Sequence, residues 1–490
     1  MEIKVSVLVY VLNGISYADR CLRSVMGQTL GEIEILVIDG GSTDGTLELA
    51  EELARKDPRI RIIHSGPGVG RQFNTGLREA CGEYIGICES DDFLLPDMYE
   101  RQYRIAREFD LDMLRADAWH FFGPEGRESF LPAVLSKQQE LYGRVLDLRE
   151  DTRVVSLGIN SFWSGIYRRQ FLLEQGIMMN ETGGASYQDV TFSFLTVVKA
   201  GRAMLSREAF YCYRLDNSGS SVNSPRGMDL LGREYRLLKE RLGAEGLFSR
   251  YRGIYLGWKV DSCLGFYDSF PEGQREAYVP VMCQDIKEDL DSGILQEEVP
   301  GAAQREMVLL AGQSADALGL RLRRTYDVYR QMKQKMESIE KERSVVVFGK
   351  GDLGRLAGLY LVGRGRNIAA YIDNGAAAYL EQDTGRNTGT ERNNIRGNFL
   401  FLPAPGVRED SSSGQKQEGL RIPLFAPERG ASMYPDGVYV LASEAGHEDM
   451  KRQLLGLGIS EENIISWGSY GYFLKHVLIE SEKACRQEER

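Results

Sequence analysis

The chain has 490 residues, of which 42% are hydrophobic and 27% charged, and its formal net charge is −11 at pH 7. This length is typical of roughly two to four domains, and the negative charge argues against a general nucleic-acid-binding protein. No apolar run is long enough to span a bilayer, and the N-terminus resembles a strand more than a signal peptide. Seven scattered cysteines without CxxC pairs and only four histidines favour a reducing cytoplasm over a disulfide framework or a zinc site.

The first hundred residues alternate between strand and helix patterns. Strands are expected at 5–11, 33–38, 59–64 and 84–88, and helices at 18–26, 47–55 and 74–80. This alternation predicts a mostly parallel sheet with right-handed crossovers. The carboxyl ends of its strands would gather Asn13, Asp39, a glycine-rich loop at 66–70 and an acidic cluster on one edge. We expect a nucleotide to bind at that edge.

The acidic cluster follows the strand at 84–88 directly and consists of Glu89, Asp91 and Asp92. Carboxylates this close repel one another unless a cation lies among them, and their oxygens suit Mg²⁺ or Mn²⁺. A metal held here could carry a nucleotide diphosphate. The alternative is an acidic turn in which Asp91 or Asp92 caps a helix.

Five motifs occur in a characteristic order along the first half of the chain. They are Val5-Ser-Val-Leu-Val-Tyr-Val-Leu-Asn-Gly14, Cys21-Leu-Arg-Ser-Val25 with Gln28-Thr29, Ile38-Asp-Gly-Gly-Ser-Thr-Asp-Gly-Thr46, Asn74-Thr-Gly-Leu77, and Gly82-Glu-Tyr-Ile-Gly86 through Glu89-Ser-Asp-Asp92. Together they resemble the family 2 glycosyltransferases, the inverting enzymes of the GT-A fold. The resemblance covers roughly residues 3–225, and it implies a nucleotide-sugar donor and a divalent metal.

The resemblance also implies roles for the acidic residues. The acid at the position of Asp39 binds the uracil or ribose of the donor, which suits a carboxylate that ends a strand; a turn-forming role is the alternative. Glu89 and Asp91 occupy the outer positions of the family's D-x-D motif. Asp91 resembles the metal ligand, and Glu89 a contact to the ribose or to the metal's water shell. Because the family usually has Asp at the position of Glu89, its contact is expected to be indirect.

Two departures from the family pattern affect the donor site. Tyr10 and Leu12 stand where the family commonly has Pro and Tyr, so Tyr10 could supply the ring that stacks on the base, or it could be ordinary core. The arginine that often precedes Asn74 is replaced by Phe73, and Arg71 could reach the diphosphate instead or be solvated at a helix start. These departures leave the base and the sugar open.

The catalytic base is expected further along the chain. The segment 161–171, apolar and then basic, is similar to that of family members with bacterial surface-polysaccharide roles. The family places its base at a helix start, in an acidic pair that corresponds here to Gln188 and Asp189. An inverting displacement needs such a carboxylate to take the acceptor's proton; an N-cap with a lowered pKa is the alternative for Asp189. Arg214 could contact the diphosphate, and 217–223 could form a lid over the donor or an ordinary loop.

The remainder of the chain is expected to form a helical region and a second α/β domain. Helical spacing occurs at 233–242, 254–264, 284–290, 305–318 and 322–339, and the last is either a spacer or a dimer seam. From residue 344 a buried strand leads into Gly-Lys-Gly-Asp-Leu-Gly354, and Asp373 follows at Rossmann spacing. A Rossmann-like domain follows, either a cofactor site or a degenerate regulatory or docking unit. A stretch rich in Gly, Asn, Thr and Ser at 375–420 is read as a flexible insertion.

The sequence therefore predicts a GT-A catalytic domain over 1–225, a helical region over 226–343, a Rossmann-like domain over 344–470 and a C-terminal helix or tail over 471–490. The leading hypothesis is a metal-dependent inverting glycosyltransferase of the hexosyltransferase type that uses a UDP-sugar. It would act in the cytoplasm on a surface-polysaccharide (capsule) or lipid-linked acceptor. Peripheral contact with the membrane and homodimerisation are left open. The alternatives are a nucleotidyltransferase, an NAD-dependent oxidoreductase in the C-terminal domain, and a non-catalytic scaffold.

Overall fold

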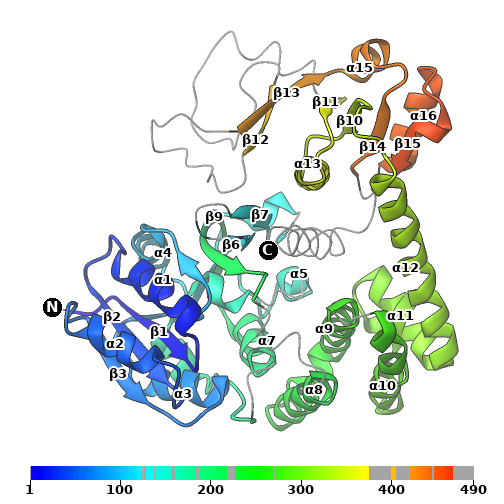
Figure 1. Cartoon of the computed structure of the whole chain (residues 1–490). Helices are drawn as coiled ribbons and strands as arrows, with labels where there is room; N and C mark the ends of the chain where they lie inside the picture. The colour runs from blue at the N-terminus through cyan, green and yellow to red at the C-terminus, as the bar shows by residue number, and fades with distance from the viewer. Residues whose placement is uncertain are drawn as a thin grey trace. The chain divides into compact units, whose positions relative to one another are not determined.

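The computed structural model describes residues 2–123, 125, 128–136, 138–156, 161–183, 187–217, 227–269, 272–374, 399–403, 419–443 and 446–466. The chain divides into two compact units, Met1–His120 with Pro132–Leu320, and Phe121–Leu131 with Arg321–Arg490 (Figure 1). In the described part of the chain, every helix is too short or too polar to cross a bilayer.

The first unit begins with the expected strand and helix alternation, drawn in blue in Figure 1. Its elements are β1 Val5–Val11, α1 Ile15–Met26, β2 Ile33–Asp39, α2 Thr46–Ala54, β3 Ile60–His64, α3 Val69–Glu79 and β4 Tyr84–Ile87. The parallel register pairs Val5 with both Ile33 and Tyr84, so the carboxyl ends of β1, β2 and β4 lie at one edge. Helix α3 begins five residues earlier than the sequence predicted, because Gly68 takes a φ of 118° at the N-cap.

The sheet continues with antiparallel strands, which makes it mixed. The further elements are β5 Phe93–Leu94, α4 Met98–Glu108, β6 Met113–Phe122, β7 Ser129–Ala133, α5 Thr152–Val155, β8 Ile166–Arg168, α6 Arg169–Glu174, α7 Asp189–Lys199 and β9 Ala203–Arg214. The strand order is β3-β2-β1-β4-β8-β6-β9-β5, and β8 pairs antiparallel with both β4 and β6. Strand β9 reaches back to β5 and so borders the acidic cluster.

Between residues 227 and 337, the described part of the chain forms five α-helices after the sheet. They are α8 Gly227–Ala244, α9 Phe248–Ser269, α10 Glu272–Asp291, α11 Ala302–Gln313 and α12 Ala315–Glu337. The prediction of one helix over 305–318 was wrong. Ser314 has an extended backbone with φ −169°, and its Oγ accepts a hydrogen bond from the Ala317 N–H, so α11 ends there and α12 begins.

The second unit contains a sheet whose strands are mostly parallel. Its strands are β10 Val345–Phe348, β11 Ile368–Ile372, β12 Phe399–Pro403, β13 Gly419–Phe425, β14 Val438–Leu441 and β15 Ile464–Ser466, and its helices are α13 Asp352–Gly363, α15 Pro427–Met433 and α16 His447–Gly456. The order is β12-β13-β11-β10-β14-β15. The glycine-rich turn lies between β10 and α13, and the Lys350 ammonium is 3.7 Å from the Asp373 carboxylate.

The predicted insertion over 375–420 needs a correction. Its residues 399–403 form β12, which pairs antiparallel with β13, because the apolar run Phe399-Leu-Phe-Leu402 suits a strand. The rest of that segment up to residue 418, and the predicted tail over 471–490, lie outside the described residues.

Candidate active site

The strand ends at the nucleotide edge are joined by one buried amide. The Gln72 side chain on α3 donates hydrogen bonds to the carbonyls of Val11, at 2.9 Å, and Ile38, at 2.8 Å. The Val11 carbonyl also accepts a hydrogen bond from the Gly40 N–H at 2.9 Å, so the Gln72 amide adds a second bond there and ties the end of β1 to β2. The sequence analysis missed Gln72. Its signal was a polar residue on the otherwise apolar face of a helix.

Asn13 and Asp39 build the turn that follows β2. The buried Asp39 carboxylate accepts hydrogen bonds from the Gly41 N–H at 2.9 Å and the Ser42 N–H at 3.0 Å, so the turn-forming arrangement left open by the sequence is present. Asn13 has a φ of 52°, and its Oδ1 accepts a hydrogen bond from the Thr43 N–H at 2.8 Å. The two side chains hold the 39–46 turn against the end of β1.

The three carboxylates after β4 have different partners. Asp92 is buried and accepts hydrogen bonds from the Tyr211 hydroxyl and the Arg214 N–H, both at 2.7 Å. Asp91 is partly exposed, and its Oδ2 accepts a hydrogen bond from the Asn217 amide at 2.8 Å. Asp92 is therefore the structural member of the cluster, and Asp91 is the one that faces the site.

Glu89 lies above Tyr10, whose hydroxyl donates to its Oε1 at 3.2 Å. The Tyr10 side chain is only 5% exposed, which leaves little ring surface on which a base could stack. Burial, and then the negative charges of Asp91 and Asp189, raise the pKa of Glu89 to about 8. Burial, and then the negative charges of Asp91 and Glu89, raise the pKa of Asp92.

The neighbouring negative charges that contribute to the raised pKa values of Glu89 and Asp92 would be offset by a bound cation. Among the described residues, no group of three or more His, Cys, Asp or Glu forms a complete metal site. The carboxylate oxygens of Asp91 and Glu89 nevertheless suit a hard cation that completes its shell with phosphate oxygens and water. The residues present thus fit Mg²⁺ or Mn²⁺ bound together with a diphosphate.

Asp189 is the first residue of α7, and Gln188 is its N-cap. The N-cap alternative for Asp189 is therefore not what the structure shows. Burial is the main reason that the pKa of Asp189 rises, from 3.8 to about 6. The charge of Asp189 is also among the causes that raise the pKa of Glu89.

A polar network supports the approach to Asp189. The Glu234 carboxylate on α8 accepts hydrogen bonds from the Asn180 amide at 2.7 Å and the Thr182 hydroxyl at 2.5 Å. The Asn74 amide group donates to the Met179 carbonyl at 2.9 Å and accepts from the Met179 N–H at 3.0 Å. Asn74, quoted above as part of a motif, therefore anchors the chain that leads to Asp189.

The two predicted arginine contacts differ in position. The Arg214 Nε donates to the Asp91 carbonyl at 3.0 Å, and its Nη1 is 3.1 Å from the Asp216 carboxylate, so Arg214 lies at the acidic cluster. Arg71 lies in the first turn of α3, half exposed, with its Nε 3.8 Å from the Glu181 carboxylate. The predicted lid over 217–223 lies outside the described residues after Asn217.

Three stacked aromatic rings border the acidic cluster. The Trp163 ring stacks on Tyr211, with centroids 4.3 Å apart, and on Tyr213, with centroids 4.9 Å apart. The Tyr211 hydroxyl also accepts a hydrogen bond from the Glu89 N–H at 3.0 Å. The sequence analysis assigned no role to these rings, since only the tertiary fold brings residues 163 and 211–213 together.

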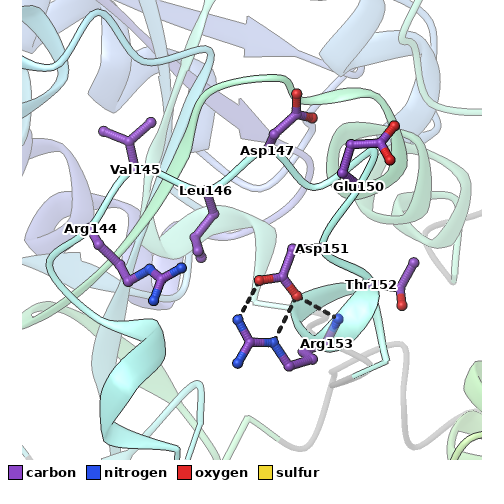
Figure 2. Close-up of a pocket in the computed structure, with 8 residues that line it drawn as sticks. All are labelled: Arg144, Val145, Leu146, Asp147, Glu150, Asp151, Thr152 and Arg153. Atoms are coloured by element: carbon purple, nitrogen blue, oxygen red, sulfur yellow. Dashed lines mark hydrogen bonds and ion pairs between the residues drawn. The ribbon is translucent and has the colours of Figure 1, made fainter.

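A separate pocket of about 470 Å³ is lined by residues 144–147 and 150–153 (Figure 2). Its carboxylates are paired locally: Asp147 lies 2.6 Å from Arg149, and Asp151 lies 2.5 Å from Arg153. The pocket is near the start of β9, because Leu146 bridges to Ala203, whereas the acidic cluster is near its end at Arg214. It is therefore distinct from the candidate site.

Comparison with known proteins supports the same interpretation. The family described as Glycosyl transferase family 2 matches residues 6–172. The first unit carries a family 2 glycosyltransferase domain. The uncharacterized glycosyltransferase YibD of Escherichia coli strain K12 is 30% identical to the chain over 228 residues, which cover 44% of this chain and 63% of YibD. The uncharacterized glycosyltransferase EpsJ of Bacillus subtilis strain 168 is 28% identical over 226 residues, which cover 45% and 63%.

The chain thus spans 63% of the length of each of these two relatives. A crystal structure of S. aureus TarS 1–349 in complex with UDP-GlcNAc has a TM-score of 0.50 at 20% identity, and the match covers 67% of this chain and 92% of that one. This likeness shows a shared fold. The glycosyltransferase domain therefore has the GT-A architecture, and its acidic cluster follows β4 at the carboxyl edge of the parallel strands.

Proposed function

We propose that the first unit transfers a sugar from a nucleotide-sugar donor, specifically a UDP-sugar, to a hydroxyl of a surface-polysaccharide or lipid-linked glycan, with inversion. The observation that carries this proposal is that a domain matching family 2 holds Glu89 and Asp91 directly after β4, where Arg214 contacts the acidic cluster through its backbone N–H and its Nε. Asp189, at the start of α7, would supply the base to the same substrate. We assign the catalytic domain to residues 1–225, the helical region to 226–343 and the Rossmann-like domain to 344–470, in a cytoplasmic protein.

The donor nucleotide would bind at the ends of β1 and β2. Asp39 and Asn13 hold the turn there, and their polar atoms are the acceptors that a base or ribose needs. Tyr10 would position Glu89 instead of stacking on the base. The choice of a UDP-sugar rests on the TarS structure, whose fold is shared and which holds UDP-GlcNAc.

The diphosphate would lie beside the acidic cluster. Asp91, with Glu89 in support, would hold the divalent cation, which when bound neutralises charge on the leaving diphosphate. Arg214 lies against the Asp91 backbone and would contact a phosphate with its guanidinium. Arg71, at the start of α3, would contact the diphosphate as well.

The acceptor hydroxyl would be activated by Asp189. A carboxylate whose pKa is about 6 is ionised at neutral pH yet is a stronger base than an ordinary aspartate. It would take the hydroxyl proton as the oxygen attacks the anomeric carbon, while the bond to the diphosphate breaks on the opposite side. The products are the glycoside, the nucleoside diphosphate and a protonated Asp189.

The test is turnover of a panel of nucleotide sugars with Mn²⁺, measured as release of nucleoside diphosphate. We expect release with a UDP-sugar, and a ~10²–10⁴-fold loss in Asp189→Asn and in Asp91→Asn. Asp147→Asn is the matched control, because this carboxylate lies at the separate pocket. If both site variants kept wild-type turnover, the assigned roles would be wrong.

A further inference from the structure

Tyr213 is an aromatic residue of the candidate site to which the proposed function gives no role. It lies in β9, two residues after Tyr211 and directly before Arg214. Residues two apart on a strand share a face, so Tyr211 and Tyr213 point to the same side. Tyr211 is completely buried, and its hydroxyl is hydrogen-bonded to the Asp92 carboxylate and to the Glu89 N–H. Tyr213, in contrast, is partly exposed.

The Tyr213 ring is held in a fixed orientation. It lies parallel to the Trp163 ring, with an interplanar angle of 9°, and Trp163 is itself only 6% exposed. The edge of His120 packs against Tyr213, with ring centroids 5.6 Å apart. A side chain fixed in this way loses little conformational entropy when it contacts a ligand.

Tyr213 lies at the acidic cluster, because the next residue, Arg214, donates its backbone N–H to Asp92 and its Nε to the Asp91 carbonyl. The Trp163 ring that stacks on Tyr213 belongs to a turn that also contacts α7, the helix that begins at Asp189. Burial is the main reason that the pKa of Tyr213 is raised well above 10, and nearby carboxylates raise it further. The hydroxyl is therefore a hydrogen-bond donor at every pH at which the protein would work. Among the described residues no hydrogen-bond partner of this hydroxyl occurs, so its donor is available to a ligand.

We propose that Tyr213 contacts the transferred sugar of the donor and determines which sugar is accepted. The inference rests on the proposed function. In that function the diphosphate binds at the acidic cluster and the acceptor hydroxyl at Asp189, so the transferred sugar must lie between the two. The phenol donates a hydrogen bond to one sugar hydroxyl or carbonyl oxygen. A hexose or an N-acetylhexosamine presents such an oxygen.

The test is Tyr213→Phe, which removes the hydroxyl and keeps the stacked ring. We expect kcat/KM for the preferred UDP-sugar to fall ~10–100-fold, and the preference over its epimers to fall with it. The Kd of UDP with Mn²⁺ and the Tm should stay at the wild-type values. Tyr103→Phe is the matched control, since its hydroxyl bonds to Glu83 outside the site, and it should leave the rates unchanged.

Deoxy analogues of the donor sugar identify the contact. Wild type should lose activity with the analogue that lacks the bonded oxygen, and Tyr213→Phe should lose nothing further with that analogue. If Tyr213→Phe kept wild-type kcat/KM and epimer preference, weakened UDP binding, or lost rate equally with every analogue, the inference would be overturned. Wild-type protein that turned over no nucleotide sugar would instead overturn the proposed function.

Discussion

At the residue scale, four carboxylates share one site but have different surroundings. Asp92 is buried and hydrogen-bonded on both oxygens, which suits a structural role. Asp91 and Glu89 are less enclosed and suit a cation. Asp189 is separated from the others in sequence by about a hundred residues, yet its charge reaches Glu89. Surroundings, more than residue type, therefore distinguish a structural acid from a reactive one.

The pKa of Asp189 predicts a pH dependence of activity. Because the base must be ionised, kcat/KM for a UDP-sugar should fall as the pH drops through about 6. The measurement is a pH–rate profile of kcat/KM with saturating Mn²⁺. An Asp189→Glu variant with residual activity should shift the pH at which kcat/KM falls on the acidic side of the profile. A profile that stayed flat down to pH 4.5 would contradict the assignment of Asp189 as the base.

The same pKa predicts how Asp189 affects stability. Its pKa is raised above 3.8 in the folded state, so the native protein binds this proton more tightly than the unfolded chain does. Its contribution to stability is greatest at low pH and falls as the pH rises from about 4 to about 6. Asp189→Asn should therefore stabilise the protein at pH 7, by ~1–3 kcal/mol, and the gain should vanish near pH 4. The measurement is the difference in Tm between variant and wild type across this range; an N-capping Asp would give the opposite sign.

At the element scale, one glycine allows helix α13 to pack closely on the turn that follows β10. In the second unit, a Cβ added to Gly354 would lie 1.9 Å from the Gly349 carbonyl oxygen, whereas at Gly351 it would meet no atom within 4 Å. The Tyr371 hydroxyl on β11 also donates to the Gly354 carbonyl at 3.0 Å. The third glycine of the motif thus has a packing role that is independent of any cofactor.

Gly354→Ala should therefore destabilise the second unit by ~3 kcal/mol, because backbone has to move to admit the methyl group. Gly351→Ala is the matched control and should change stability by no more than ~0.5 kcal/mol. The measurement is thermal unfolding of the full chain. Equal Tm values for the two variants would contradict the packing described for α13 and β10.

At the scale of the whole molecule, the effect of a ligand on the Tm shows whether the folded protein binds it. A ligand that binds only the folded state raises the Tm, by ~2.7 kcal/mol of stability at a hundredfold excess over Kd. We expect UDP with Mn²⁺ to raise the Tm more than UDP alone, because the cation joins the diphosphate to Asp91. Asp91→Asn should abolish the difference that Mn²⁺ makes. A shift with NAD(H) instead would favour the oxidoreductase alternative for the second unit.

Local patterns in the sequence determined the elements and much of the candidate site. The alternation of strands and helices over 5–88, the acidic cluster after β4 and the helix that begins at Asp189 are all local signals, because periodicity and turn residues act within a few positions. The GT-A domain and the parallel sheet of the second unit followed from these signals and from the family resemblance. The break at Ser314 was missed although its signal is local, a serine whose hydroxyl accepts from the Ala317 N–H. The strand β12 was missed because it depends on β13 as its partner.

Only the tertiary structure decided which residues meet. The stack of Trp163 on Tyr211 and Tyr213, and the bridge of Gln72 between β1 and β2, join residues 34 to 61 positions apart in the chain. The pKa of Glu89 is raised by burial and by the charges of Asp91 and Asp189, and that of Asp189 by burial and the charge of Glu234. Burial and these neighbours cannot be read from composition and spacing. The sequence by itself determined the type of chemistry, and the fold decided the geometry and the charge state in which that chemistry is held.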